Sequence, residues 1–171
     1  TELRSLGFLP DKSTPVPLME RPLRLLSSEL RHTSYLKVSE GCDHTCAFCA
    51  IPMMRGLHRS QPVHDLVSEA SGLHAAGVQE INIVSQDTTW YGRDLRRHDS
   101  GAPLLPDLLR ALLEGTAVPW YRLFYMYPSG ITRELVDLLA SENRILPYLD
   151  MPIQHGSDRI LTLMRRPERR K

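Results

Sequence analysis

One stretch decides how this sequence is interpreted: Glu40-Gly41-Cys42-Asp43-His44-Thr45-Cys46-Ala47-Phe48-Cys49-Ala50-Ile51-Pro52. It contains all three cysteines of the 171 residues, and their spacing is Cys-x3-Cys-x2-Cys. Three thiolates this close in sequence can bind one soft metal centre, but they are one ligand short of a closed tetrahedral site. The missing ligand leaves a position at which a substrate or cofactor can bind.

The spacing alone leaves three interpretations of the cysteines open. A zinc site needs a fourth ligand, for which His44 and His58 are candidates, although structural zinc sites usually pair Cys-x2-Cys units from two segments. A 4Fe-4S cluster would be bound through three irons by Cys42, Cys46 and Cys49, and its fourth iron would stay open to another ligand. The third interpretation is three buried cysteines without a metal. The spacing favours the cluster.

The composition is typical of a globular protein of one domain, with 42% hydrophobic and 24% charged residues. The net charge of +1 argues neither for nor against a nucleic-acid partner. The basic residues at 165–171 are interpreted as a solvated helix end. No apolar run approaches the roughly 20 residues of a membrane span, and no secretory signal opens the sequence. We therefore expect a cytoplasmic protein without a membrane partner.

Hydrophobic periodicity predicts strands that alternate with helices. Residues 1–34 contain four prolines and are expected to form an irregular leader or linker before a core at 35–171. Strands are predicted at residues 35–39, 80–84, 121–126 and 148–151. Helices are predicted at residues 62–76 and 104–113, and after the capping residues Thr132 and Ser157.

About four βα units of this kind predict an α/β fold with a parallel sheet and right-handed crossovers, which is either part of a barrel or doubly wound. In both cases ligands bind beyond the C-terminal ends of the strands. Polar residues follow each predicted strand: the cysteines, then residues 85–87, then 127–128, then 154–155. We expect these four loops to form one rim.

The cysteine spacing after the first strand of a repeating βα chain is the signature of the radical S-adenosylmethionine (SAM) superfamily. Residues 35–42, 48–52 and 55–56 more narrowly resemble the methylthiotransferases of that superfamily. Residues 85–88 and 148–157 are most similar to the branch that modifies an aspartate of a small-subunit ribosomal protein (protein twelve). The tRNA-modifying branch more often has Asn at the position of Asp87. The resemblance covers about residues 35–166.

The resemblance implies a partial, TIM-like radical SAM barrel with a 4Fe-4S cluster and SAM as cofactors. In the family, the reduced cluster cleaves SAM to methionine and a 5′-deoxyadenosyl radical, which removes a hydrogen atom from an unactivated carbon. The implied product is a methylthio group on the β-carbon of an aspartate in a ribosomal protein, and an electron donor is needed as a partner. The alternatives are an adenosine in tRNA as the substrate, and a non-catalytic zinc or iron–sulfur binding module.

Residue by residue, the resemblance implies that Cys42, Cys46 and Cys49 are the cluster ligands, with no further catalytic residue. It assigns six residues to cofactor binding: Phe48, Arg55, Ser85, Gln86, Asp87 and Gln154. Phe48 would lie near the adenine, residues 85–87 near the SAM amino group, and Gln154, which is preferred to His155, on the same rim. For three of these residues a structural role is the alternative. Phe48 could be a core aromatic, Asp87 could cap a turn, and Arg55 could brace the cysteine loop.

Two features depart from the family pattern. Gln61 stands between Ser60 and Pro62 where the family commonly has Arg, so a carboxylate contact from that position is not expected, although Arg59 is adjacent. Family members also carry an N-terminal domain with a second 4Fe-4S cluster and a C-terminal β-barrel, and their core has about six βα units. We therefore expect a fragment that is inactive alone.

Overall fold

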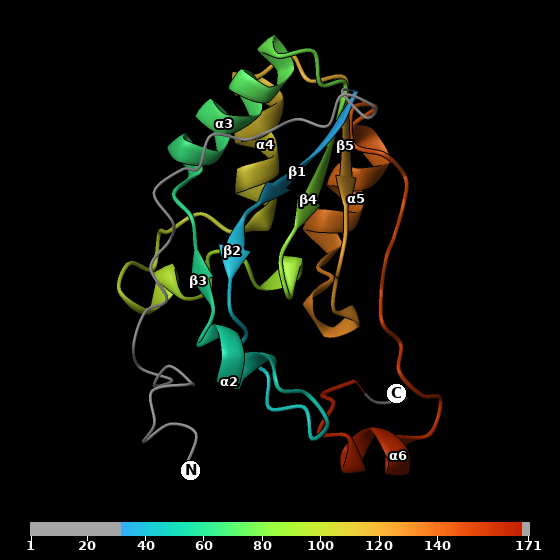
Figure 1. Cartoon of the computed structure of the whole chain (residues 1–171). Coiled ribbons are helices and arrows are strands. Elements are labelled where there is room, and N and C mark those ends of the chain that lie inside the picture. The colour runs from blue at the N-terminus through green and yellow to red at the C-terminus, as the bar shows by residue number, and fades with distance from the viewer. Residues whose placement is uncertain (1–31, 169–171) are drawn as a thin grey trace.

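The computed structural model of the chain describes residues 32–168 (Figure 1). The leader predicted at 1–34 lies outside the described residues except at its end, where β1 begins at Thr33. In chain order the elements are β1 (Thr33–Lys37), β2 (Ser39–Glu40), α2 (Ile51–Arg55), β3 (Arg59–Ser60), α3 (Val63–Ala75), β4 (Glu80–Val84), the 3-10 turns η1 (Thr88–Trp90) and η2 (Leu95–Arg97), α4 (Leu105–Gly115), β5 (Trp120–Leu123), the 3-10 turn η3 (Pro128–Gly130), α5 (Arg133–Ser141) and α6 (Asp158–Leu163).

The central sheet consists of three parallel strands in the order β1-β4-β5. Because the spatial order follows the chain order, right-handed crossovers place the connecting helices on the same face of the sheet. A doubly wound sheet would instead reverse its order and carry helices on both faces. The α/β fold with a parallel sheet is therefore confirmed, and its topology is that of a partial barrel.

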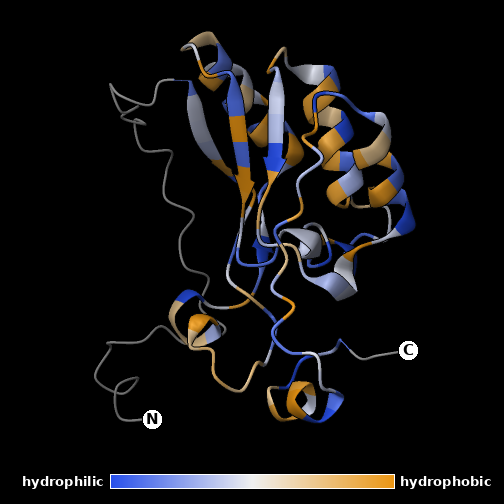
Figure 2. Cartoon of the chain, turned by 90° about the vertical axis from the view of Figure 1, so that its right-hand side faces the viewer, coloured by the Kyte–Doolittle hydropathy of each residue, from blue (hydrophilic) through white to orange (hydrophobic). Residues whose placement is uncertain are grey.

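One face of the sheet packs against the helices and forms the core. In β4, Ile81 and Ile83 are fully buried on this face, whereas Glu80 and Asn82 alternate onto the other. Figure 2 shows the same alternation of hydrophobic and hydrophilic residues along a strand. Each helix contributes a row of buried apolar side chains to the core: Leu66, Ala70 and Leu73 of α3; Leu108, Leu109 and Leu112 of α4; Leu135 and Leu138 of α5.

Most predicted elements form at or near their predicted ends. The strand at Glu80–Val84 is confirmed residue for residue. Thr132 caps α5 by accepting a hydrogen bond from the backbone N–H of Leu135 at 3.1 Å. Ser157 stands at the start of α6, but its side chain makes no capping bond.

The prediction of a fourth strand at 148–151 is wrong. Ile145 makes one isolated parallel bridge with Tyr121 of β5. Pro147 then interrupts the pairing, because proline has no N–H to donate to the ladder. Within the described residues the fourth βα unit therefore has a loop in place of its strand, and this loop descends beside β5 toward α6 (Figure 1).

The antiparallel pairing of β2 with β3, which was not predicted, closes the base of the cysteine loop. The backbone N–H of Cys42 donates to the carbonyl of Gly56 at 3.1 Å. Gly41 has φ +80°, and a Cβ at this position would lie 2.2 Å from the carbonyl oxygen of Leu57. Only glycine fits at this point of the loop.

Within residues 32–168, none of the helices combines the length and the apolar character that crossing a membrane requires.

Arg144 ties the end of α4 to the start of β5. Its guanidinium donates hydrogen bonds to the carbonyl oxygens of Leu113, Thr116 and Val118 at 2.7–2.8 Å. We predict that Arg144→Met lowers the free energy of unfolding by about 3 kcal/mol, because the carbonyls lose a charged donor. Urea denaturation followed by circular dichroism measures the difference.

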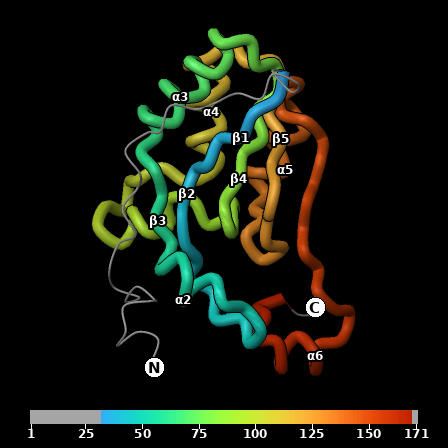
Figure 3. Tube along the Cα trace, in the orientation of Figure 1, coloured from blue at the N-terminus to red at the C-terminus, as the bar shows by residue number. Residues whose placement is uncertain are grey.

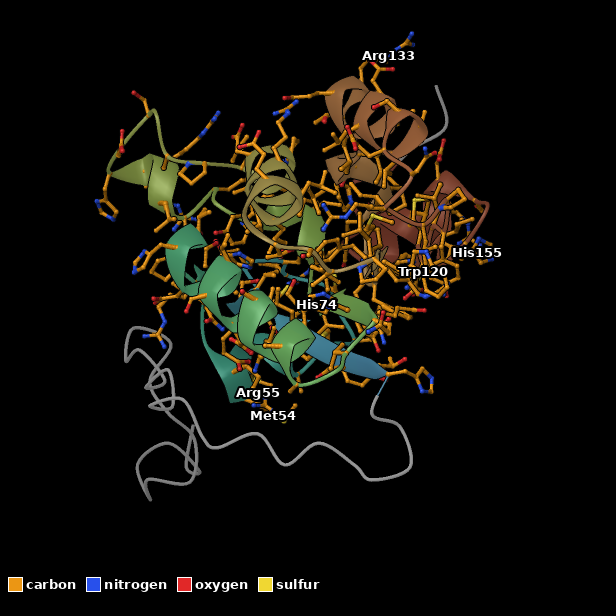
Figure 4. The ribbon with its side chains drawn as sticks, turned by 90° about the horizontal axis from the view of Figure 1, so that it is seen from above. Met54, Arg55, His74, Trp120, Arg133 and His155 are labelled. Atoms are coloured by element: carbon orange, nitrogen blue, oxygen red, sulfur yellow. The ribbon has the colours of Figure 1, made fainter. Side chains whose placement is uncertain are left out.

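The control is Arg133→Met on the outer face of α5, where Arg133 projects away from the fold (Figure 4). Its ion pair with Asp137 is highly exposed, so we expect a change of less than about 0.5 kcal/mol. Equal effects of the two substitutions would contradict the role of Arg144.

Candidate cluster and cofactor site

The three cysteines line one pocket of about 140 Å³, beyond the C-terminal ends of the strands. The loops after β4 and β5 also contribute, and so does the loop that replaces the fourth strand, as expected for one common rim. The lining residues are Cys42, His44, Cys46, Phe48, Cys49, Ile51, Gln86, Tyr125, Tyr127, Pro152 and Arg166.

The cysteine loop reaches from β2 across to the C-terminal segment. The backbone N–H of Ala47 donates to the carbonyl of Met164 at 3.0 Å, directly after α6. Figure 3 shows the loop and α6 side by side below the sheet. The last helix therefore closes the far side of the pocket, and Arg166 follows it into the pocket wall.

The three cysteines are free thiols that differ in their solvent exposure. Cys42 and Cys46 are buried, with 7% and 9% of their surface exposed, and Cys49 is half-buried. Burial raises the pKa of the Cys42 thiol to about 11. Burial also raises the pKa of Cys46, and the positive charge of Arg166 opposes this shift. Thiolates are the metal-binding form, so binding of a soft metal here is coupled to proton release.

Asp87 is a turn cap at the start of η1, which is one of the two roles left open by the sequence. Its Oδ1 accepts hydrogen bonds from the backbone N–H and the hydroxyl of Thr89 at 3.0 and 2.6 Å. Its Oδ2 lies 2.7 Å from Nε2 of His44, and the residue is only 1% exposed. Asp87 is not among the lining residues, so a direct contact with a cofactor stays a prediction without geometric support.

Gln86 is the residue of the predicted 85–87 group that lines the pocket. Its Nε2 donates to Oε1 of Glu40 at 3.3 Å, which fixes the orientation of the amide. Its Oε1 is buried and has no hydrogen-bond partner within the described part of the chain. An unpaired buried acceptor is costly, so a donor on a bound ligand would be stabilised here. Ser85 is also buried, with Oγ 3.4 Å from the hydroxyl of Thr88, and does not line the pocket.

Arg55 lies outside the pocket and braces the loop, the second role that the sequence left open. Its guanidinium is 3.8 Å from a carboxylate oxygen of Glu40, and it projects from the outer edge of the molecule (Figure 4). Glu40 also pairs with Lys37. Glu40 was missed as a site residue, although its position directly before Gly-Cys could have drawn attention to it. Its buried carboxylate ties Gln86 to the base of the cysteine loop.

Phe48 lines the mouth of the pocket and is 59% exposed, so its interpretation as a core aromatic is wrong. Gln154 and His155 are exposed and lie outside the pocket wall, where the same loop contributes Pro152 instead. His155 lies at the periphery in Figure 4. The role predicted for Gln154 therefore has no support in this geometry.

The interpretation of residues 165–171 as a solvated helix end is wrong for Arg166. This residue is 6% exposed, and its guanidinium carbon lies 4.3 Å from the ring centre of Tyr127 and 5.7 Å from that of Phe48. Tyr127, which received no role from the sequence beyond its place after a strand, is buried beside Cys46. No sequence signal distinguished Arg166 from its basic neighbours.

The two candidate zinc ligands are engaged by other side chains. His44 contacts Asp87, and Nε2 of His58 lies 3.3 Å from the hydroxyl of Ser60. Burial lowers the pKa of His58. Among residues 32–168, no three or more His, Cys, Asp and Glu side chains are grouped so as to hold a single metal ion.

Gln61, which departs from the family pattern, has a structural role. Its side-chain amide donates to the carbonyl of Lys37 at 2.6 Å, and its own carbonyl accepts from the Tyr91 hydroxyl at 2.7 Å. These bonds hold the segment after β3 against β1.

Comparisons of the sequence with known families and known proteins agree with one another. The family model of the Radical SAM superfamily matches residues 36–171. The chain is 50% identical over 136 residues to the ribosomal protein uS12 methylthiotransferase RimO of Symbiobacterium thermophilum, covering 80% of this chain and 27% of that protein. It is 54% identical over 134 residues to RimO of Desulforudis audaxviator, covering 78% and 29%. The chain thus spans less than a third of the length of these relatives.

Among solved structures, the chain is similar to TsrM, a radical SAM methyltransferase from Kitasatospora setae with cobalamin and a [4Fe-4S] cluster bound. The TM-score is 0.50 at 18% identity, over 75% of this chain and 24% of that one. A second TsrM structure, with tryptophan and a SAM analogue, gives 0.51 at 19% identity over 77% and 24%. At such identity the similarity concerns the fold alone.

The different burial of the thiols predicts different alkylation rates. In metal-free protein at pH 8, iodoacetamide should label Cys49 about tenfold or more faster than Cys42, because Cys42 is buried and protonated well below its pKa of about 11. Labelling of Cys42 should rise as the pH approaches that value. Fragment-ion mass spectrometry locates each label. Equal rates at Cys42 and Cys49 at pH 8 would contradict this geometry.

Proposed function

Because the chain belongs to the Radical SAM superfamily, we propose that its three-cysteine pocket binds a 4Fe-4S cluster and SAM for methylthiotransferase chemistry. The observation that carries the proposal is the convergence of Cys42, Cys46 and Cys49 on one pocket with Gln86 and Phe48. Soft thiolate donors suit iron–sulfur clusters, and three of them leave one iron for another ligand. The donor set and the shared pocket therefore fit the cluster.

Six of the lining side chains have a role in this proposal. The cysteines hold the cluster, and the free Oε1 of Gln86 accepts a hydrogen bond from the SAM ammonium group. Phe48, exposed at the mouth, offers a face for the adenine ring. Arg166, packed over Phe48, restricts access of water. When bound and reduced, the cluster would supply the electron for the reductive cleavage of SAM.

The substrate that we propose is an aspartate of ribosomal protein uS12, whose β-carbon would exchange a hydrogen for a methylthio group. Support comes from the RimO relatives, which are 50% and 54% identical to this chain. The activity belongs to a chain of the relatives' full length, together with a one-electron donor. Asp87 favours the branch that modifies a ribosomal protein, because the tRNA-modifying branch more often has Asn at this position. It is not proposed to contact the substrate, because both of its carboxylate oxygens are bonded within the fold.

We predict that a chain carrying this segment within the full length of its relatives modifies uS12 and not tRNA. The assay offers purified uS12 and, separately, unmodified tRNA to the anaerobic, reduced enzyme with SAM and a sulfide source. Mass spectrometry should find one methylthio group on a uS12 aspartate. Methylthioadenosine in the tRNA with unchanged uS12 would transfer the proposal to the tRNA-modifying branch.

Gln86→Ala should weaken SAM binding about tenfold while the iron and sulfide content stays unchanged, because one hydrogen bond to a charged group is lost. A calorimetric SAM titration of the reconstituted protein measures the affinity. The matched control is Gln79→Ala, since Gln79 is exposed at the opposite end of β4. An unchanged affinity in Gln86→Ala would remove Gln86 from the SAM site.

A further inference from the structure

The hydroxyl of Tyr127 contacts a proposed cluster ligand. Its oxygen lies 3.1 Å from Sγ of Cys46, although the two residues are 81 positions apart in sequence. Both side chains are buried, with 7% and 9% of their surface exposed. In the metal-free thiol either group can donate the hydrogen bond. Once Cys46 binds iron as a thiolate it has no proton, so the phenol must then be the donor.

The ring of Tyr127 is held in place by His44. The two rings are stacked, with their centres 4.1 Å apart and their planes inclined by 9°. His44 also contacts Trp90 in a T-shaped arrangement, with 5.0 Å between ring centres. A stacked neighbour restricts the rotation of a tyrosine ring, so His44 fixes the direction in which the Tyr127 hydroxyl points.

His44 is itself oriented by Asp87. The carboxylate oxygen Oδ2 lies 2.7 Å from Nε2 of His44, and the other oxygen is bonded to Thr89. Because the carboxylate is an acceptor, Nε2 carries the proton and the imidazole plane is set by this bond. Carboxylate, imidazole, phenol and cysteine sulfur thus form a continuous chain of contacts, which begins outside the pocket at Asp87 and ends in the pocket wall at Cys46.

The positive charge of Arg166 lies next to this chain of contacts. The guanidinium carbon of Arg166 lies 4.3 Å from the ring centre of Tyr127, within cation–π distance. A cation over a phenol makes its O–H a better hydrogen-bond donor. Both features act in the same direction, because each stabilises negative charge on the sulfur of Cys46.

We propose that Tyr127, positioned by His44 and Asp87, donates a hydrogen bond to Cys46 that raises the reduction potential of the cluster. Hydrogen bonds to cluster sulfurs stabilise the reduced state, which carries one more negative charge than the oxidised state. The proposal rests on the proposed function, because it requires a cluster on Cys46. Tyr127 and His44 are positioning and tuning residues, and neither exchanges an electron or a proton with a substrate.

The test compares Tyr127→Phe with the wild-type chain after anaerobic reconstitution with iron and sulfide. A one-electron donor, dithionite, reduces the cluster in a potentiometric titration that is followed by electron paramagnetic resonance. Tyr127→Phe should keep its iron and sulfide but reduce at a more negative potential. We expect the equilibrium constant for reduction to fall about tenfold, which is about 59 mV for a one-electron couple. The control is Tyr125→Phe, which removes a hydroxyl from the same pocket and should leave the potential unchanged.

A second variant tests the positioning role. His44→Gln can still bond to Asp87 but loses the stacked ring, so it should lower the potential in the wild-type background. It should have little further effect in the Tyr127→Phe background, because His44 acts through the hydroxyl that is already absent. Additive shifts in the double variant would overturn the role of His44.

The outcomes separate the two proposals. If the wild-type chain assembles no four-iron cluster, the proposed function fails. If the wild type and Tyr127→Phe both assemble the cluster and have equal potentials, this inference alone is overturned. Loss of the cluster in Tyr127→Phe, with retention in Tyr125→Phe, would make Tyr127 necessary for assembly and would also overturn the tuning role.

Discussion

The parallel pairing of β1, β4 and β5 is the constraint on which the site depends. Because the strands run in the same direction and in chain order, their C-terminal ends meet at one edge of the sheet. Each polar loop therefore starts close to its neighbours, although the loops are widely separated in sequence. The contact between Cys46 and Tyr127 joins loops from the two outer strands of the sheet across the end of β4.

Two buried carboxylates hold the cysteine loop in position at two points. Glu40 connects its base to Lys37, Arg55 and Gln86. Asp87 connects its middle to η1 through His44. A buried carboxylate is tolerated only when its oxygens are paired, so each network specifies one arrangement of its members. The short loop is thereby kept in one conformation with its thiols facing one pocket.

The sequence predicted the periodic parts of the fold better than the local exceptions. The strand at 80–84 follows from alternation of polar and apolar residues, and the capping by Thr132 follows from hydroxyl chemistry. The fourth strand was wrong because Pro147 breaks a ladder that the apolar pattern favours on either side. Pro147 directly precedes the predicted strand, so the sequence itself contained the signal against it.

The same limit applies to the site residues. The spacing of the cysteines is local, so the sequence was sufficient to identify them. Gln86 lines the pocket and Asp87 does not, because Asp87 is the residue that bonds to His44. The burial of Arg166 depends on the position of α6 next to the cysteine loop. Both are long-range contacts, and neither leaves a local pattern.

We propose that the three cysteines hold a 4Fe-4S cluster with one iron open to SAM. This proposal is tested most directly by the electron paramagnetic resonance spectrum of the reconstituted, reduced chain with and without SAM. We expect a four-iron signal that changes when SAM is added and that is absent from Cys46→Ala. A spectrum that SAM leaves unchanged, or a purified protein that holds one zinc and no labile sulfide, would contradict it.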